Sequence, residues 1–331
     1  MAREETRRSG LAARLVSAAA APEGSGASAR AESTRGGGAI PSHEHYTSPA
    51  SSRAWIDFCS SGAFARHEAG KRLLREVAAT LAPDFLRAPA GGGRASLISL
   101  GVGDGVKDLE IMRRVRGSLN ITYWPVDVSS TFLENCSEAA RREGVKVVPV
   151  CGNFLHIGNA INGENCREPR VVALLGNTIG NLDQTEACSA LRRLVRKGDL
   201  AVVEVFVVGA GEEEAAGEVY GSPAYHEFLL AAVAGAGLDP RGGRLDVDFG
   251  RLSVCGQEVR VVQNYFVLGG EVVVEGGGGK LRLAAGHRLP LVKSLRYGRD
   301  SLCRIISDNG FQVVRFAQRG GVAVAFCRRK T

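Results

Sequence analysis

A short apolar run meets a cluster of glycines at residues 97–105, and an amphipathic segment follows at 106–115. This order is typical of a strand, a tight turn and a helix. Glycine adopts positive φ without a steric penalty, and the turn lets a ligand approach the unpaired N–H groups of the helix N-terminus. We therefore expect the nucleotide-binding corner of a Rossmann-like sheet. Val106 stands where a dinucleotide-binding fingerprint has its third glycine, and the Gly-Lys-Ser/Thr of a P-loop is absent. An ordinary glycine-rich turn therefore stays an alternative on this stretch alone.

Strands and helices alternate regularly after this turn. Helical spacing of the apolar residues predicts helices over 106–115, 131–143 and 184–195. Continuous apolar runs predict the strands between them, at 97–100, 121–126, 145–150, 171–175 and 200–208. Strands that are apolar along their whole length are buried on both faces, so they indicate a parallel sheet covered by helices. Residues 96–208 are therefore the predicted core of an α/β domain.

The residues before this core divide into two parts. Residues 1–45 are rich in Ala, Gly, Ser and Arg and predict a disordered N-terminal tail. An organelle transit peptide is the alternative, although such peptides are poor in acidic residues and this segment holds several. Residues 46–95 predict an N-terminal helical segment, with a short buried turn around Trp55 and a helix over 68–81.

A different pattern follows the core. Residues 209–290 begin with two predicted helices, and over 244–284 short alternating runs punctuated by glycines predict antiparallel hairpins. We interpret this region as an inserted, mainly antiparallel β subdomain that binds substrate. Residues 291–331 then return to the core sheet with a helix at 301–309 and two closing strands. A parallel sheet that ends in an antiparallel pair is the order of a class I methyltransferase, at this point an analogy of fold alone.

Composition and charge exclude several classes of function. The eight cysteines are scattered, without a Cys-x-x-Cys pair or a Cys/His cluster, so we expect no metal site. Without a secretory signal, reduced thiols favour the cytoplasm. No apolar run approaches the roughly 20 residues that span a bilayer, so we expect no membrane partner. The formal charge of +7 is mild for 331 residues, and no run of Lys and Arg is interleaved with aromatic residues, so we expect no nucleic-acid partner.

Polar or glycine residues follow four successive strands of the predicted sheet, where an open α/β sheet binds its ligand. These residue types suit a nucleoside ligand. Glycines allow a charged tail to approach, a carboxylate can accept hydrogen bonds from ribose hydroxyls, and an amide beside an aromatic ring can bind adenine. A second amide would face a second ligand. In this order they are Gly101 and Gly103, Asp127, Asn153 and Phe154, and Asn181. Each has an alternative, since Asp127 suits a helix N-cap, Asn153 a turn and Phe154 a core. Four such strand ends together favour a ligand site.

Two longer segments resemble a known family. Residues 124–129 read Trp-Pro-Val-Asp-Val-Ser, and residues 174–182 read Leu-Leu-Gly-Asn-Thr-Ile-Gly-Asn-Leu. Both are similar to signature segments of the histidine-specific methyltransferases, a family that includes the ergothioneine-pathway histidine Nα-methyltransferase. The likeness covers residues 96–208 and returns weakly at 284–311. It implies a Rossmann-like class I methyltransferase sheet, S-adenosylmethionine (SAM) as cofactor, and a small-molecule substrate, which is a free amino acid or derivative methylated at its α-amine.

The resemblance also implies roles for individual residues. Six residues fall on cofactor-binding positions of the family, namely Gly101, Gly103, Lys107, Asp127, Asn153 and Phe154. Three residues fall on substrate-binding positions, namely Asn181, Tyr220 and Ser294. In-line methyl transfer needs alignment of donor and acceptor and a neutral amine, and no Asp, Glu or His of the sequence is assigned as a general base.

The substrate pocket departs from the family. Val292 stands where the family has a glutamate that binds the imidazole of histidine. Valine cannot accept a hydrogen bond, so a buried imidazole N–H would stay unpaired at a cost of about 1–3 kcal/mol. We therefore expect an apolar or aromatic substrate side chain in place of histidine. Ser99 replaces an acidic residue at the end of the first strand, Asn153 replaces an aspartate, and residues 62–68 keep only the Arg and Glu of the family's double-tyrosine lid.

These departures leave two alternatives open. The positive charge and the missing lid permit a protein or nucleic-acid acceptor, whose binding to polyanions would depend steeply on salt. The changes at Ser99, Asn153 and the lid permit a non-catalytic SAM-binding member of the family, which failure to bind the cofactor would favour further.

Overall fold

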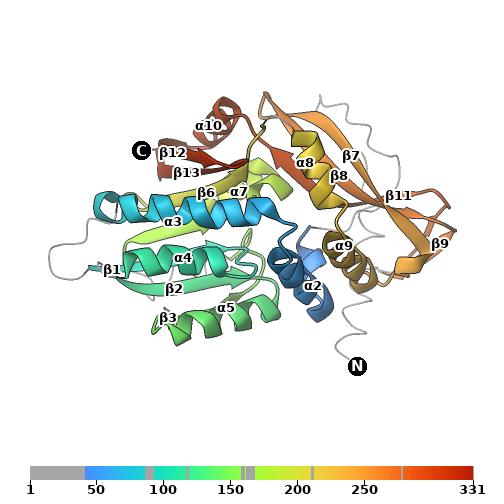
Figure 1. The fold of residues 1–331 in the computed structure, drawn as a ribbon, viewed down its shortest axis with the longest axis horizontal. Helices are drawn as coiled ribbons and strands as arrows, with labels where there is room; N and C mark the ends of the chain where they lie inside the picture. The colour runs from blue at the N-terminus through green and yellow to red at the C-terminus, as the bar shows by residue number, and fades with distance from the viewer. Residues whose placement is uncertain are drawn as a thin grey trace.

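A mostly parallel sheet carries helices on both faces, and a smaller antiparallel sheet stands beside it (Figure 1). The computed structural model of the chain describes residues 42–85, 93–116, 119–157, 161, 168–209, 212–276 and 279–330. Most of the expected N-terminal tail, residues 1–41, lies outside the described residues.

The large sheet has the strand order β12-β13-β6-β5-β1-β2-β3, and β4 pairs with the end of β2. The pairs among β1 to β6 are parallel, whereas β13 is antiparallel to both β6 and β12. The strand bounds are β1 Gly93–Leu100, β2 Leu119–Asp127, β3 Lys146–Val147, β4 Val150–Cys151, β5 Arg170–Leu174, β6 Leu200–Phe206, β12 Phe311–Arg319 and β13 Val322–Arg329. This order confirms the predicted Rossmann-like class I methyltransferase sheet.

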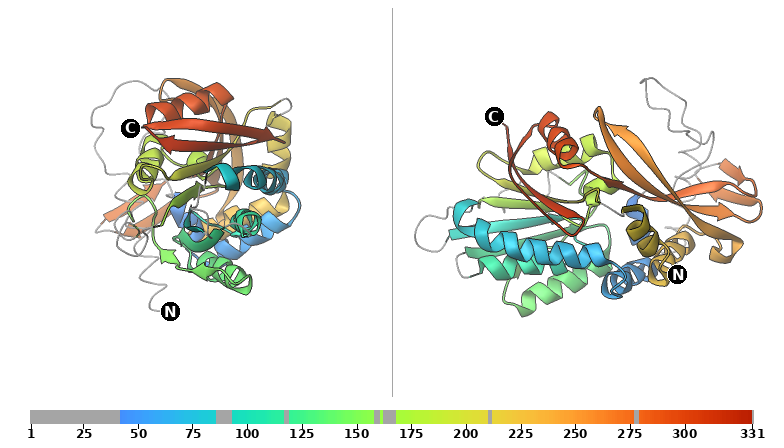
Figure 2. Two further views of the ribbon diagram at one scale, coloured as in Figure 1. Left: turned by 90° about the vertical axis from the view of Figure 1, so that its left-hand side faces the viewer. Right: turned by 45° about the horizontal axis from the view of Figure 1, so that its top comes forward.

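Alternate residues of the strands face two separate hydrophobic cores. Leu97 packs into the core shared with one set of helices, whereas its neighbour Ile98 packs into the other. This two-sided burial explains why the strands are apolar along their length. The helices of the first face are α3 (Ala65–Phe85), α4 (Val106–Val115) and α5 (Ser130–Arg142), and those of the second are α7 (Gln184–Leu194) and α10 (Arg299–Asp308), as Figure 2 shows.

The inserted region is an antiparallel sheet with two helices. Its strands and helices are α8 Glu212–Tyr220, α9 Pro223–Gly235, the 3₁₀ turn η3 Pro240–Gly242, β7 Gly243–Val254, β8 Gln257–Leu268 and β11 Arg288–Arg296, with β9 Val272–Gly276 and β10 Gly279–Leu283 as a separate pair. The sheet order β11-β8-β7 corrects the expected boundary, because residues 291–296 pair with β8 instead of the core. The return to the core begins at Tyr297, which bridges Val207.

Two N-terminal elements also correct the sequence predictions. A 3₁₀ helix, η1 (Ser42–Tyr46), occupies the last residues of the expected tail, because His45 is fully buried and the Tyr46 ring stacks on Phe228. The expected turn around Trp55 is a full helix, α2 (Pro49–Ser60), which begins at a Ser-Pro pair suited to a helix start. Within the described part of the chain, no helix is long and apolar enough to cross a membrane.

Candidate cofactor and substrate site

The glycine-rich turn lies between β1 and α4 and requires its glycines. Gly101, Gly103 and Gly105 have φ values of 67°, 57° and 70°, a region that side chains rarely adopt. A Cβ atom at Gly105 would also lie 2.4 Å from the Cβ atom of Cys136 on α5. The turn therefore follows the sequence prediction, with a backbone that a ligand can approach closely.

Asp127 ends β2 and faces this turn. Its Oδ1 accepts the N–H of Ser129 at 2.9 Å, and its Oδ2 accepts the N–H of Gly103 at 3.3 Å. The N-cap of α5 is Ser129, so the N-cap alternative for Asp127 is wrong. Burial raises the pKa of Asp127 to about 6, and backbone hydrogen bonds oppose that effect only in part. A ligand that donates hydrogen bonds to this carboxylate would favour its ionised form.

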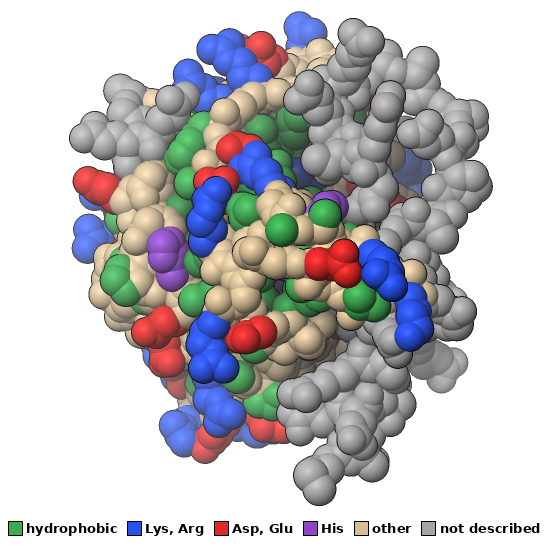
Figure 3. Space-filling model, turned by 90° about the vertical axis from the view of Figure 1, so that its right-hand side faces the viewer, with side chains coloured by type: hydrophobic (Ala, Val, Ile, Leu, Met, Phe, Trp, Pro, Cys, Tyr) green, Lys and Arg blue, Asp and Glu red, His purple; other side chains and the backbone are tan. Residues whose placement is uncertain are grey.

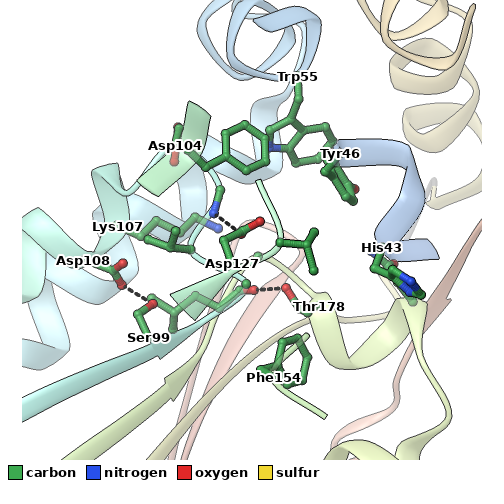
Figure 4. A pocket seen from close by; sticks show the side chains of 18 of the residues that line it. His43, Tyr46, Trp55, Ser99, Asp104, Lys107, Asp108, Asp127, Phe154 and Thr178 are labelled. Carbon is green, nitrogen blue, oxygen red and sulfur yellow. Dashed lines mark hydrogen bonds between the residues drawn. The ribbon is translucent and has the colours of Figure 1, made fainter. Parts of the chain in front are cut away.

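All six predicted cofactor residues line one pocket, which we call the first pocket. It has an empty volume of about 1040 Å³, including space open to solvent. In Figure 4 the rings of Tyr46 and Trp55 lie on one side of Asp127, and the ring of Phe154 lies on the other. The side chain of Asn153 accepts the N–H of Leu155 at 3.0 Å, so it also performs the turn role given as its alternative.

Lys107 reaches the first pocket as one half of a buried ion pair. Its Nζ lies 2.6 Å from Oε1 of Glu204, a side chain with no exposed surface. The second carboxylate oxygen of Glu204 accepts the N–H of Gly176 at 2.9 Å. The positive charge of Lys107 is therefore already balanced by a carboxylate. The ion pair also fixes α4, β6 and the segment after β5 relative to one another.

A second buried carboxylate compensates for the departure at Ser99. The Ser99 Oγ donates to Oδ1 of Asp108 at 2.9 Å, and the Tyr123 hydroxyl donates to Oδ2 at 2.6 Å. Burial raises the pKa of Asp108 to about 7, against these two hydrogen bonds. The sequence has no acid at the end of β1, but α4 brings a carboxyl group to that place.

The structure gathers three potential metal ligands that are scattered in the sequence. One ligand atom each of Cys59, His67 and Asp104 lies within 4.8 Å of the others, in the wall of the first pocket. His67 Nε2 lies 3.0 Å from Oδ2 of Asp104. Burial, the largest single influence, would raise the pKa of Asp104, but the interactions with His67, the Val106 N–H and the Lys107 charge together outweigh it and lower the pKa. Burial raises the pKa of the Cys59 thiol, which disfavours the thiolate that a metal binds. The absence of a metal stays a prediction.

A second pocket adjoins the first and holds all three predicted substrate residues, together with Val292. Its empty volume is about 390 Å³, including space open to solvent. Its walls are mainly aromatic, with Tyr46, Trp55, Phe58, Phe64, Phe206, Tyr220, Tyr225 and Phe228 among the lining residues. The two pockets share Tyr46, Trp55, Gly176 and Asn181. A ligand in the first pocket and a ligand in the second would therefore meet beside Gly176 and Asn181.

The segment 174–182 builds this junction through the 3₁₀ helix η2 (Thr178–Asn181). Asn177, with a left-handed φ of 62°, accepts the N–H of Phe206 at 2.9 Å and donates to the Ser294 Oγ at 3.2 Å. A Cβ atom at Gly180 would lie 2.6 Å from the Asn177 amide nitrogen. The segment thus joins the core strand β6 to the subdomain strand β11.

Sequence reasoning missed several residues of the site. Tyr46 and Trp55 form the shared wall, although the aromatic cluster near Trp55 was a usable signal. Asp108 lines the first pocket, Glu204 pairs with Lys107 of that pocket, and Tyr225 lines the second pocket. None of the last three belongs to a short motif, because each is positioned by elements distant in sequence.

Comparisons with known proteins identify the family and several distantly similar structures. The sequence profile of a family described as histidine-specific methyltransferase, SAM-dependent, matches residues 39–327. A comparison with curated proteins found no significant match. Similar solved structures include a SAM-dependent methyltransferase from Clostridium acetobutylicum ATCC 824, at 10% identity over 84% of this chain and 92% of that chain, with a TM-score of 0.39. The glycopeptide N-methyltransferase MtfA in complex with sinefungin is similar at 14% identity, over 79% and 94% of the two chains, with a TM-score of 0.39.

Proposed function

The chain belongs to the family of histidine-specific, SAM-dependent methyltransferases, and from that membership we propose that it methylates the α-amine of a free amino acid or amino-acid derivative. The substrate side chain in this proposal is apolar or aromatic. SAM supplies a methyl group activated by its sulfonium centre. The residues of the chain then have to hold the cofactor and the amine in line.

The observation that carries the proposal is the junction of the two pockets. The first pocket offers the Asp127 carboxylate for ribose hydroxyls and the glycine turn for the charged methionine end of the cofactor. The second pocket adjoins the first and offers mainly aromatic walls, which are typical of small-molecule sites. Asn181 lies in the walls of both pockets, so we assign it to hold the amino-acid head group beside the reacting methyl.

The chemistry of the second pocket suits a neutral amine. Among its described lining residues there is no acidic side chain, and most are aromatic. An ammonium group placed there loses hydration without gaining a carboxylate partner, so its pKa falls and the free amine is favoured. A nearby sulfonium would lower that pKa further. Val292 in the wall favours an apolar or aromatic substrate side chain over imidazole.

The distribution of charge on one face of the molecule favours a small acceptor over a nucleic acid there. On the face shown in Figure 3, Lys and Arg side chains are interspersed with Asp and Glu among the described residues. Proteins that bind nucleic acid through their backbone phosphates gather basic side chains into one patch or stripe. Methylation of a protein acceptor is one outcome that the assay below can detect.

Mass spectrometry of methylated products tests the proposal. The protein is incubated with SAM and a panel of free amino acids that includes tryptophan, tyrosine, phenylalanine and histidine, with Asp127→Ala as the matched variant that lacks the ribose ligand. We expect one or more methyl additions on an aromatic or apolar amino acid, and none with the variant. Cofactor binding by calorimetry without any product on the panel would overturn the free-amino-acid substrate. Methylation of an added protein or RNA would instead identify a macromolecule as the acceptor.

A further inference from the structure

The wall of the first pocket holds three side chains that the proposed reaction leaves unused. Cys59 lies near the end of α2, His67 lies in the first turn of α3, and Asp104 lies in the glycine-rich turn before α4. We call these three residues the Cys-His-Asp cluster. Cys59 and His67 are buried, yet all three residues line the first pocket, so an ion can reach them from its open space.

The separations within the cluster are close to those around a zinc ion. His67 Nε2 lies 3.0 Å from Oδ2 of Asp104, and two such atoms bound to one tetrahedral zinc ion lie about 3.3 Å apart. The sulfur of Cys59 lies within 4.8 Å of both ligand atoms, so a small rotation of its side chain would bring it to bonding distance.

The fourth position around such an ion would face the pocket. Among the described residues, no further Cys, His, Asp or Glu joins the group. Figure 4 shows His43, another histidine of the first pocket, away from Asp104. Zinc sites with three protein ligands take water at the fourth position, so a bound ion would project a water molecule into the first pocket.

Neighbouring residues already orient two of the three ligands. The ring of His67 stacks on that of Phe64, with a centroid separation of 5.7 Å and an interplanar angle of 24°. Oδ1 of Asp104 accepts the N–H of Val106 at 3.2 Å, which leaves Oδ2 to face His67. Metal ligands in proteins are typically oriented by such contacts from the residues behind them.

The local charges and the ligand types favour zinc. The lysines whose charges act on Cys59 are Lys71 and Lys107. Each is paired with a carboxylate, that of Glu68 and that of Glu204, so their repulsion of a cation is reduced. A thiolate and an imidazole bind Zn²⁺ in preference to Mg²⁺ and Ca²⁺, which prefer oxygen ligands.

We propose that Cys59, His67 and Asp104 bind one zinc ion, and that this ion inhibits the enzyme by excluding the cofactor from the first pocket. On binding, the thiol proton of Cys59 passes to solvent, and zinc takes the place of the hydrogen that His67 shares with Asp104. The ion and its water then occupy space beside Gly103, where the charged end of the cofactor is expected.

This zinc takes no part in methyl transfer. The proposal departs from the sequence-based expectation of no metal site, because the three ligands become neighbours only in the fold. It does not depend on the identity of the methyl acceptor.

Metal titration of the chelator-treated protein tests the site. Zinc affinity is measured by competition with a chromogenic chelator, and Co²⁺ alone serves as a spectroscopic probe. Wild-type protein should bind one Zn²⁺ per chain, and its Co²⁺ complex should show a thiolate-to-cobalt charge-transfer band. Cys59→Ser should lose this band. Cys59→Ser and His67→Gln should each weaken zinc binding about tenfold or more, because the loss of even an outer contact to a metal ligand costs about 10–100-fold.

A double variant controls for binding at exposed thiols. Cys151 and Cys255 are the exposed cysteines among the described residues, and Cys151→Ser/Cys255→Ser should keep the stoichiometry, the affinity and the band of wild type. A cooperative thermal transition without metal shows that each variant is folded. An unchanged band or affinity in Cys59→Ser would overturn the site, and loss of both in the double variant would assign the metal to exposed thiols instead.

Calorimetry with S-adenosylhomocysteine tests the exclusion of the cofactor. Saturating Zn²⁺ should raise the Kd of this ligand about tenfold or more in wild type and change it little in Cys59→Ser. By linkage, S-adenosylhomocysteine should weaken zinc binding by the same factor. A Kd that zinc leaves unchanged in wild type would overturn the inhibitory role. Because neither measurement uses a methyl acceptor, failure here is distinct from failure of the proposed reaction.

Discussion

The ammonium group of Lys107 lies 2.6 Å from the carboxylate of Glu204, and both side chains are buried in the middle of the fold. Through its second oxygen, Glu204 also holds the N–H of Gly176, where the two pockets meet. The ion pair therefore connects α4, which follows the glycine-rich turn, to the segment where the two pockets meet. Its loss should affect both stability and activity.

Neutralising one partner of this pair should destabilise the protein strongly. Glu204→Gln leaves the Lys107 ammonium buried without its carboxylate, and we expect a loss of about 3–5 kcal/mol in the free energy of unfolding. The double variant Lys107→Met/Glu204→Gln removes the stranded charge and should be more stable than the single variant. Urea denaturation measures both. A loss below about 1 kcal/mol in Glu204→Gln would show that the pair is not needed.

The packing of α3 against the same pair gives a second prediction. A Cβ atom at Gly70 would lie 2.2 Å from the Glu204 carboxylate oxygen, so Gly70→Ala should destabilise by about 1–3 kcal/mol. A Cβ atom at Gly217, in helix α8, would meet no other atom within 4 Å, so Gly217→Ala should instead stabilise by about 0.5–1 kcal/mol. Thermal unfolding of the two variants compares them. The opposite order would contradict the close contact at Gly70.

Cofactor binding should weaken at acid pH. Burial raises the pKa of Asp127 to about 6 in the unliganded protein, so the carboxylate is ionised above and protonated below that pH. Ribose hydroxyls donate to the ionised form, so binding lowers this pKa and becomes linked to loss of a proton. The Kd of S-adenosylhomocysteine should rise below pH 6 by up to about tenfold per pH unit. The Asp127→Asn variant should bind S-adenosylhomocysteine more weakly, and its Kd should not depend on pH in this range. If the Kd of the variant changes with pH as that of the wild type does, the titrating group is a residue other than Asp127.

Val292 should control the choice of side chain. Val292→Glu places an acceptor in the wall of the second pocket, where an imidazole N–H can be satisfied, so kcat/KM for histidine relative to tyrosine should rise about tenfold or more. Lys293→Glu is the control, since this neighbour is not part of the pocket wall. Competition between the two amino acids in one assay gives the ratio directly. An equal shift in both variants would point to a general charge effect.

The sequence was sufficient to predict the core of the fold and the gathering of the six proposed cofactor residues at one place, while their binding role stays a prediction. The helical spacing at 106–115 gives the bounds of α4 as the structure has them, and five of the six predicted cofactor residues stand at strand ends that, with Lys107 of α4, line one pocket. Topology explains this success, because parallel strands place their carboxyl ends at one edge of the sheet.

The subdomain was harder to predict, for identifiable reasons. The strand β11 was missed because its register shifts between Pro290 and Lys293, which breaks the alternation that marks a strand. The charge of Arg296, on β11, reaches Tyr225, on α9, because the fold brings these distant parts of the chain near one another. No local pattern reports a contact between residues 71 positions apart in this chain.

The destination of an isotopically labelled methyl group tests the account most directly. The protein is supplied with SAM carrying a ¹³C-methyl group and with an ¹⁵N-labelled aromatic amino acid from the panel, and a carbon–nitrogen correlation spectrum of the product is recorded. The account predicts that the label is bonded to the α-nitrogen. A label on a side-chain atom, or label found only on protein or nucleic acid, would contradict it.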